Sequence, residues 1–313
     1  MSSTWTPAKP HWLQDVAAVL PDDVHAIHAR WRRLADRYGA LLVGEVYEQE
    51  PRRLADYVAT DRLHSSFWFG LVEYHGWEPV GIASMLRDAV SASPRLSWAQ
   101  GNHDRSRAVC RYGGGLRGRR RWLALQALVT FLPGTAWLYQ GEELGLGNAS
   151  IPPSAGADPL GAAEPSESRD GVRTPMPWSP EPGLGFTTGT PWLSDGGRQP
   201  ADTMDVQRTS PTSMLHAVTR LLAVHQEFRT ELGEPNLGVS WLDTANPEVV
   251  GYQRGPLVVA ANLGDRDAAI FAAGEIVFDS DRLDTPAGTR VATVLLRPAQ
   301  AIVLRRQRTC AAR

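Results

Sequence analysis

The chain has 313 residues, of which 42% are apolar and 21% charged, with a formal net charge of −2. This composition is that of a soluble globular protein of one large or two moderate domains, and the near-neutral balance gives no reason to expect nucleic acid as a partner. No apolar run approaches a membrane span, the N-terminus lacks the apolar core of a signal peptide and the two cysteines form no disulfide or metal pattern, so we expect a cytoplasmic protein without membrane contact.

From residue 22 the sequence alternates helix and strand patterns. Asp22 and Asp23 are helix-start signals, apolar residues then recur at helical spacing, and Gly39 ends the predicted helix. The apolar run at 41–43 predicts a strand buried on both faces. We expect further helices near 50–59, 78–91 and 116–132, and further strands at 66–69, 96–101 and 134–139. Such alternation predicts a parallel sheet, in a barrel or a doubly wound arrangement.

The second half of the chain has different patterns. Residues 147–205 are rich in Pro, Gly, Ser and Asp without periodicity, and the aromatic residues among them favour a packed loop. A helix is expected near 212–230. Short apolar segments then follow at 249–252, 257–259, 291–296 and 301–304, which predict a small antiparallel β domain. The predicted domains are therefore residues 1–235 and 236–313.

Polar residues follow two of the predicted strands. Glu45 comes directly after the strand at 41–43, and Asn102-His103-Asp104 follows the strand at 96–101. In a parallel barrel these positions face the active-site mouth, where a carboxyl among apolar neighbours can act as a general acid and an Asp can stabilise positive charge. The alternatives are an acid at a helix N-terminus for Glu45 and a loop turn for Asn102 and Asp104. No third ligand at a suitable spacing accompanies them, so we expect neither a metal nor a cofactor.

Two histidines, two glutamates and the tryptophans each allow two interpretations. His25 and His28 lie three positions apart on the first predicted helix, which suits either a metal or a solvated helix face. Glu142 and Glu143 follow the fourth predicted strand, where they either add acid to the rim or brace the following loop. The eleven tryptophans suit either sugar stacking or an ordinary core.

Taken in order, these segments resemble glycoside hydrolase family 13, the α-amylase family. Residues 41–46 (LLVGEV) resemble its general-acid strand, residues 101–107 (GNHDRSR) a later signature, and residues 131–146, which contain WLYQGEELGL, its eighth strand. Residues 169–178 (RDGVRTPMPW) and the GFTTG–PWL stretch at 185–193 resemble the loop of the α-glucosidase and oligo-1,6-glucosidase branch. The similarity covers nearly the whole chain in the family's order.

The resemblance implies an α/β fold, the C-terminal half of a (β/α)8 barrel with about four βα units and without strands 1–4, followed by a small antiparallel β-sandwich domain. It implies a retaining α-glucosidase-type hydrolase that acts on α-glucosidic bonds of oligosaccharides. Glu45 would be the acid/base and Asp104 the transition-state stabiliser. The implied sugar contacts are His103, Asn102, Arg107 and Arg173. Preference for α-1,4 or α-1,6 bonds, and hydrolysis against transfer, stay open.

The family's nucleophile, an Asp two positions after an Arg on the fourth strand, has no counterpart before Glu45. Asp15, Asp22, Asp23 and Asp36 follow no buried strand and have no Arg two positions earlier. We therefore expect a chain that begins after the fourth strand, with two open barrel edges, and that is inactive alone. Three hypotheses follow: a glycosidase half completed by a separate N-terminal half or by self-association, a silent remnant with at most weak sugar binding, and an interaction module that recruits a partner strand.

Overall fold

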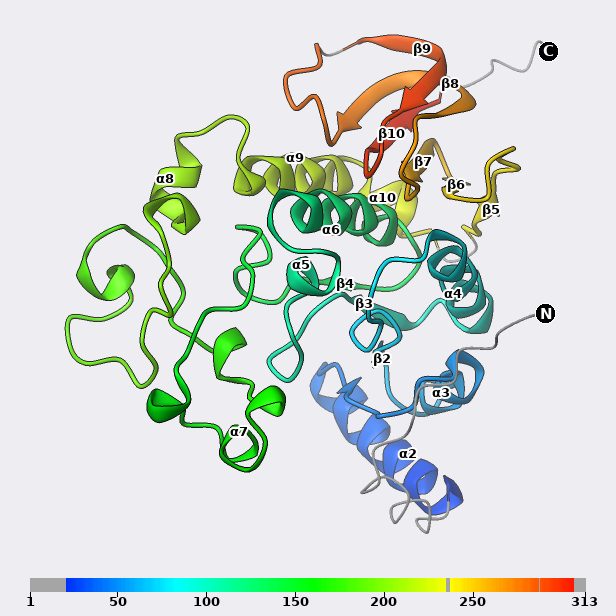
Figure 1. The fold of residues 1–313 in the computed structure, drawn as a ribbon. Helices are drawn as coiled ribbons and strands as arrows, with labels where there is room; N and C mark the ends of the chain where they lie inside the picture. Colours follow the sequence, from blue (N-terminus) through cyan, green and yellow to red (C-terminus); the bar gives the residue numbers. More distant parts are fainter. Residues whose placement is uncertain (1–20, 235–236, 287, 307–313) are drawn as a thin grey trace, which may run out of the picture.

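The computed structural model describes residues 21–234, 237–286 and 288–306 (Figure 1). Its first part alternates helices and strands: α2 (Pro21–Tyr38), β1 (Val43–Gly44), α3 (Pro51–Tyr57), β2 (Ser65–Trp68), α4 (Pro79–Ala92), β3 (Leu96–Ala99), α5 (Ala108–Arg111), α6 (Gly115–Thr130) and β4 (Ala136–Trp137). The four strands form one sheet in the order β1-β2-β3-β4, and each strand is parallel to its neighbour. The predicted parallel sheet is confirmed. It is open, because no strand in the described ranges pairs with the outer edge of β1 or β4.

Two of the helices on this sheet begin at signals that the sequence carries. Glu50 and Glu78 each precede a proline, and their carboxylates accept hydrogen bonds from the first free N–H groups of α3 and α4. An acceptor at the cap and a proline in the first turn both favour a helix start, because the first N–H groups have no partner within the helix. These capping interactions determine the residue at which each of the two helices begins.

Strand β1 differs from its prediction. The apolar run at 41–43 predicted a strand buried on both faces, but only Val43–Gly44 forms a strand, and Leu41 and Val43 are exposed. The prediction was wrong because, within the described ranges, β1 has a neighbouring strand on one side only, and its side chains at Leu41 and Val43 are left exposed. Strand β3, which has neighbours on both sides, is buried along its whole length.

Residues between β4 and the next long helix, α9 (Met214–Glu227), form the predicted irregular loop. The regular elements described within it are short: α7 (Pro159–Ala163), α8 (Met204–Arg208) and several 3₁₀ turns, among them one at Asp170–Val172. The loop is packed, since Leu144, Leu146 and Met176 form a buried cluster. It lies on one side of the molecule in Figure 1, where α7 and α8 are labelled.

The last part of the chain is one curled antiparallel sheet. After α10 (Arg229–Leu232) come β5 (Ser240–Trp241), β6 (Val249–Arg254), β7 (Leu257–Asn262), β8 (Ala268–Asp279), β9 (Arg290–Leu296) and β10 (Ala301–Arg305). The expected β-sandwich is corrected to a single sheet in the order β5-β6-β7-β10-β8-β9. An irregularity in the β8–β9 pairing lies between Phe271 and Gly274, and the first half of β8 packs with β9 on side chains of β7 and β10. A sheet bent at an irregularity can cover its own second face.

Helix α6 lies between the two sheets (Figure 1). Its residues from Trp122 to Thr130 are all buried. The Tyr252 hydroxyl donates to the carbonyl of Leu128 over 2.5 Å, and Arg254 donates to the carbonyl of Phe131 over 3.0 Å. One hydrophobic core therefore includes residues of both sheets. The predicted domain boundary at 235/236 falls on residues outside the described part. Among the described helices, none has the length and hydropathy needed to cross a membrane.

Candidate active site

The carboxyl ends of the parallel strands carry the predicted site residues. Glu45 follows β1, and Asn102 and His103 follow β3. Because the strands are parallel, these ends share one edge of the sheet. All three residues line one cavity of about 220 Å³. The structure thus brings together two segments that lie more than fifty residues apart in the chain.

Aromatic side chains form the remaining walls of this cavity, namely Phe67, Phe69, Trp137 and Tyr139. The rings of Phe67 and Phe69 stack at a centroid distance of 5.9 Å, and the Trp137 ring lies 5.2 Å from that of Phe67. Phe67 and Phe69 share a face because side chains alternate along a strand, while Trp68 points into the core. None of these residues was predicted from the sequence as part of the site, although the alternation in Ser66-Phe67-Trp68-Phe69 indicates that Phe67 and Phe69 share a face.

Glu45 is exposed in the cavity mouth rather than enclosed by apolar neighbours. The alternative interpretation was an acid placed at a helix N-terminus. That position belongs to Glu50, whose carboxylate accepts from the backbone N–H groups of Arg52 and Arg53. The Glu45 side chain is therefore not used as a helix cap and stays accessible to a molecule in the cavity.

Asp104 is held by two arginines of the loop that follows β4. Nη2 of Arg173 and Nη1 of Arg169 lie 2.5 Å and 3.1 Å from its Oδ1 atom. Arg173 also donates from Nε to the carbonyl of His103 over 2.8 Å. Nε2 of His103 lies 3.5 Å from Oδ2 of Asp104. Arg173 thus contacts Asp104, one of the predicted site residues. Arg169 also contacts Asp104 and was not predicted from the sequence, although it begins the RDGVRTPM segment.

The turn after β3 combines both interpretations that the sequence left open. Oδ1 of Asn102 accepts from the backbone N–H of Asp104 over 3.0 Å, which is an Asx turn. Asn102 also lines the cavity. Asn102 therefore both forms the turn that contains His103 and Asp104 and contributes its own side chain to the cavity wall.

Asp158 anchors Arg169. Its side chain is fully buried, Oδ2 accepts from the backbone N and from Nε of Arg169 at 2.8 Å each, and Oδ1 accepts from Nη2 at 2.7 Å. These hydrogen bonds hold the pKa of the Asp158 carboxyl well below its usual range and raise the pKa of Arg169. Asp158 therefore holds the Arg169 guanidinium in the orientation in which its Nη1 atom contacts Asp104.

Arg107, expected to contact sugar, lies elsewhere. It is buried, and its guanidinium donates to the carbonyls of Gln140 and Val172 over 2.8 Å and 3.2 Å. It stacks on the ring of Tyr139 at 5.1 Å and is not among the residues that line the cavity. As a correction to the expected role, this arginine ties the β4 segment to the loop behind the rim.

Glu142 and Glu143 brace the segment after β4. Glu142 is buried and accepts from the backbone N–H of Tyr139 over 2.9 Å and from Nε1 of Trp122 over 3.3 Å. Burial raises the pKa of Glu142 to about 7. Glu143 accepts from the backbone N–H of Gly141 over 2.8 Å. Of the two interpretations, the bracing role is the one that the structure shows.

The paired histidines of α2 pack on α3. The rings of His25 and His28 lie 4.8 Å and 5.9 Å from the ring of Tyr57, and burial lowers the pKa of His28. The described residues contain no group of three or more His, Cys, Asp or Glu that could hold a metal ion. Asp36 pairs with Arg32 at 2.9 Å and His64 at 3.1 Å, away from the cavity, and Asp15 lies outside the described residues.

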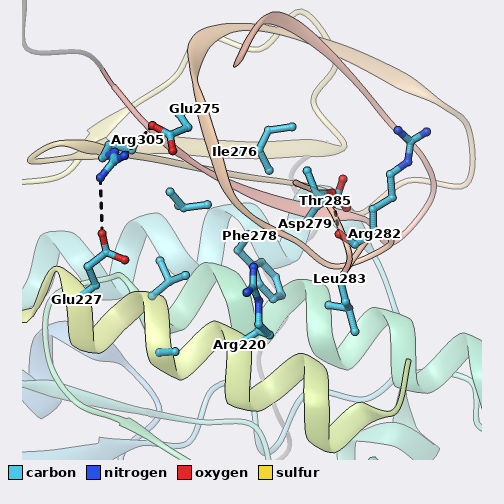
Figure 2. A pocket seen from close by; sticks show the side chains of 13 residues that line it. Arg220, Glu227, Glu275, Ile276, Phe278, Asp279, Arg282, Leu283, Thr285 and Arg305 are labelled. Carbon is cyan, nitrogen blue, oxygen red and sulfur yellow. Dashed lines mark hydrogen bonds and ion pairs between the residues drawn. The ribbon is translucent and has the colours of Figure 1, made fainter. Parts of the chain in front are cut away.

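A second hollow, of about 360 Å³, lies between α9 and the strands β8 and β10 (Figure 2). Arg305 forms ion pairs on both sides of it. Its Nη1 atom lies 3.6 Å from Oε1 of Glu227, and its Nη2 atom lies 2.7 Å from Oε2 of Glu275. None of the predicted site residues lines this hollow. Of the predicted site residues, Glu45, Asn102 and His103 line the cavity at the rim of the parallel sheet instead.

Comparison with known proteins gives the family of the chain. Residues 13–231 match the family model "Alpha amylase, catalytic domain". The chain is 35% identical over 203 residues to a probable alpha-glucosidase of Rhizobium meliloti, covering 62% of this chain and 37% of the relative. It is 27% identical over 245 residues to probable oligo-1,6-glucosidase 2 of Bacillus subtilis, covering 64% and 43%.

The chain thus spans less than half the length of these curated relatives. Among solved structures, it resembles the alpha-glucosyl transfer enzyme XgtA with a TM-score of 0.75 and 31% identity, over 92% of this chain and 55% of that one. The family model covers well over half of the chain, and the relatives agree with it. The chain belongs to the α-amylase family, glycoside hydrolase family 13.

Proposed function

We propose that this chain supplies the acid/base and the charge-stabilising carboxylate of a site that cleaves α-glucosidic bonds in oligosaccharides with retention of configuration. The observation that carries this is the cavity where Glu45 meets Asn102, His103 and four aromatic rings. Sugar sites need a few polar groups that bind hydroxyls and flat apolar faces that stack on the ring, and this cavity offers both. The named relatives include a probable alpha-glucosidase and a probable oligo-1,6-glucosidase.

In the retaining route, one carboxylic acid protonates the leaving oxygen while a second carboxylate attacks the anomeric carbon, and the first then takes a proton from the water that releases the sugar. Glu45 suits the first role because it is accessible at the cavity mouth. Asp104 suits a stabilising role because Arg169 and Arg173 hold its carboxylate in one orientation beside the cavity. His103 lines the cavity, and its Nε2 atom lies 3.5 Å from Oδ2 of this carboxylate.

The attacking carboxylate is the part of this mechanism that the described residues do not offer. Among the described residues that line the cavity, Glu45 is the only acid. Asp36 is engaged in ion pairs on α2, and Glu73, near the rim, is paired with Arg105 at 2.7 Å. The proposal therefore requires the nucleophile to come from a polypeptide segment other than the described residues.

The test measures sugar binding and hydrolysis separately. The chain is titrated with maltose and isomaltose by calorimetry, and hydrolysis of both is assayed with the chain alone and after mixing with the fragment of the Rhizobium meliloti relative that precedes the matched region. We expect sugar binding by the chain, and hydrolysis in the mixture. Glu45→Gln should reduce hydrolysis at least a hundredfold, and Glu181→Gln, an exposed acid of the loop, should not.

Binding that disappears in Trp137→Ala while the fold is retained would support the cavity as the sugar site. A folded complex that binds neither sugar, or hydrolysis that survives Glu45→Gln, would contradict the proposal. Sugar binding without hydrolysis in a folded complex would leave the chain as a catalytically silent sugar-binding remnant.

A further inference from the structure

Three side chains that follow neighbouring strands of the parallel sheet meet at one guanidinium group. Tyr47 follows β1, Glu73 follows β2 and Arg105 follows β3. Nε of Arg105 donates to Oε1 of Glu73 over 2.7 Å, and its Nη2 donates to the hydroxyl of Tyr47 over 3.0 Å. Because the nitrogens of a guanidinium are fixed in one plane and point to separate acceptors, this single side chain links the ends of three strands.

The three residues lie behind the wall of the candidate site. None of them is among the residues that line the cavity with Glu45. The ion pair is partly buried, with the side chains of Arg105 and Glu73 28% and 13% exposed. The ring of Tyr47 packs beside Phe69, at a centroid distance of 6.4 Å, and Phe69 is itself part of the cavity wall. Charge-assisted hydrogen bonds in such a place keep a more fixed geometry than exposed ion pairs do.

Tyr47 belongs to the irregular segment that carries Glu45. Strand β1 ends at Gly44, and α3 begins only at Pro51. The backbone N–H of Glu48 donates to the carbonyl of Val46 over 2.8 Å, which turns the chain but ties it to no other strand. At the end of the segment, Trp68 donates to the carbonyl of Gln49 over 3.0 Å. The link through the Tyr47 hydroxyl lies closer to Glu45 along the chain.

Arg105 is also the residue that follows Asp104. The carboxylate of Asp104 is held by Arg169 and Arg173 of the loop after β4, whereas Arg105 reaches toward β1 and β2 on the other side. The turn after β3 is therefore held from both sides. A retaining site needs its carboxylates at fixed positions around one sugar, and a displacement of about 1 Å can lower the rate about a hundredfold.

We propose that Arg105 is a positioning residue, which sets where Glu45 stands relative to Asp104 by holding Tyr47 and Glu73 through separate nitrogens. The proposal rests on the proposed function, since it takes Glu45 as the acid/base and Asp104 as the stabilising carboxylate. Arg105 does not line the cavity. Its loss should therefore lower kcat and leave KM nearly unchanged.

Three substitutions separate the link to Tyr47 from the ion pair with Glu73. Tyr47→Phe removes only the hydroxyl, Arg105→Met removes both links, and Arg105→Lys keeps a charge for Glu73 without the planar fork that also reaches Tyr47. Each variant is assayed for hydrolysis in the mixture with the fragment of the Rhizobium meliloti relative. We expect kcat to fall by about tenfold or more in all three, with KM within about twofold of the wild type. Arg105→Lys should keep the thermal stability of the wild type and still lose kcat, a combination that a purely structural ion pair would not give.

Arg119→Met and Tyr57→Phe are the matched controls. Arg119 and Asp202 form another partly buried pair, 3.2 Å apart with side chains 36% and 20% exposed, and neither residue lines the cavity. Tyr57 packs its ring on the histidines of α2. Arg119→Met should lower the stability of the chain, but both controls should leave kcat within about twofold. An equal loss of kcat in Arg119→Met would overturn the proposal.

Hydrogen exchange on the chain alone measures the positioning without any activity. The amides of residues 45–47 should exchange about tenfold faster in Tyr47→Phe and Arg105→Met, and at the wild-type rate in both controls. Tyr47→Phe keeps the ring and the ion pair, so its result stands even if Arg105→Met fails to fold. Unchanged exchange of this segment, or a rise in KM at constant kcat, would contradict the proposal. If the wild-type mixture hydrolyses no sugar, the proposed function fails, and the exchange rates still decide whether Arg105 holds the segment of Glu45.

Discussion

Arg173 donates to the carboxylate of Asp104 across 69 residues of sequence, with 2.5 Å between Nη2 and Oδ1. The same guanidinium donates to the carbonyl of His103, so one side chain of the loop fixes both the backbone and the carboxylate of the turn after β3. The loop at 147–205 is therefore a structural part of the rim. Its contribution can be measured without any assay of activity.

Replacing Arg173 by methionine should loosen this turn. The pair is partly buried, with side chains 24% and 32% exposed, so loss of its charged hydrogen bonds should lower the free energy of unfolding by roughly 1–3 kcal/mol. The amides of residues 102–104 should also exchange faster. Arg208→Met is the control, since Arg208 and Asp205 are mostly exposed and 3.9 Å apart, and such a pair contributes little. Equal effects of both substitutions would contradict a special role for Arg173.

Replacing Asp158 by asparagine should make the free energy of unfolding less dependent on pH in the acid range. Its hydrogen bonds with Arg169 lower the pKa of Asp158 in the folded state. The ionised carboxylate therefore adds stability above the unfolded value of 3.8, and this stability is lost as the pH falls through the lower folded pKa. Urea midpoints of the wild type should drop more steeply below about pH 4 than those of Asp158→Asn. The exposed Asp243→Asn variant should keep the wild-type profile.

Glu142 should produce the opposite pH dependence. Burial raises its pKa to about 7, so the folded state binds a proton that the unfolded state, with a value near 4.5, releases earlier. Stability should therefore fall as the pH rises from about 4.5 to about 7, by at most roughly 3 kcal/mol. Glu142→Gln removes the titrating group, so the difference in unfolding free energy between variant and wild type should change over this interval. A difference that stays constant with pH would show that Glu142 is ionised throughout.

Gly101 should tolerate no side chain. A Cβ atom there would lie 2.6 Å from Oε1 of Glu142, whose carboxylate is held by Trp122 and Tyr139. We expect Gly101→Ala to lower the free energy of unfolding by roughly 1–3 kcal/mol through overpacking. Gly238→Ala is the control, since a Cβ at Gly238 meets nothing within 4 Å. Thermal unfolding of both variants measures the difference, and an unaffected Gly101→Ala would mean that Glu142 can move.

Much of the fold and part of the site could be predicted from sequence, because the signals are local. The helix starts at Glu50 and Glu78 depend on a carboxylate directly followed by a proline, and the strand at 96–99 depends on a short, mostly apolar run. Glu45 and His103 could be named because each follows such a strand. These features need only the spacing of residue types, which the chain itself displays.

Other features were decided only by the tertiary structure, because they depend on which distant residues become neighbours. Leu41 and Val43 have the composition of a buried strand and yet are exposed, since burial requires a second neighbour. Arg107 belongs to the signature segment at 101–107 and yet is buried, with its guanidinium donating to backbone carbonyls. The sequence by itself therefore determined the elements and the candidates for chemistry, whereas long-range packing decided which side chains reach the cavity and which are buried behind it.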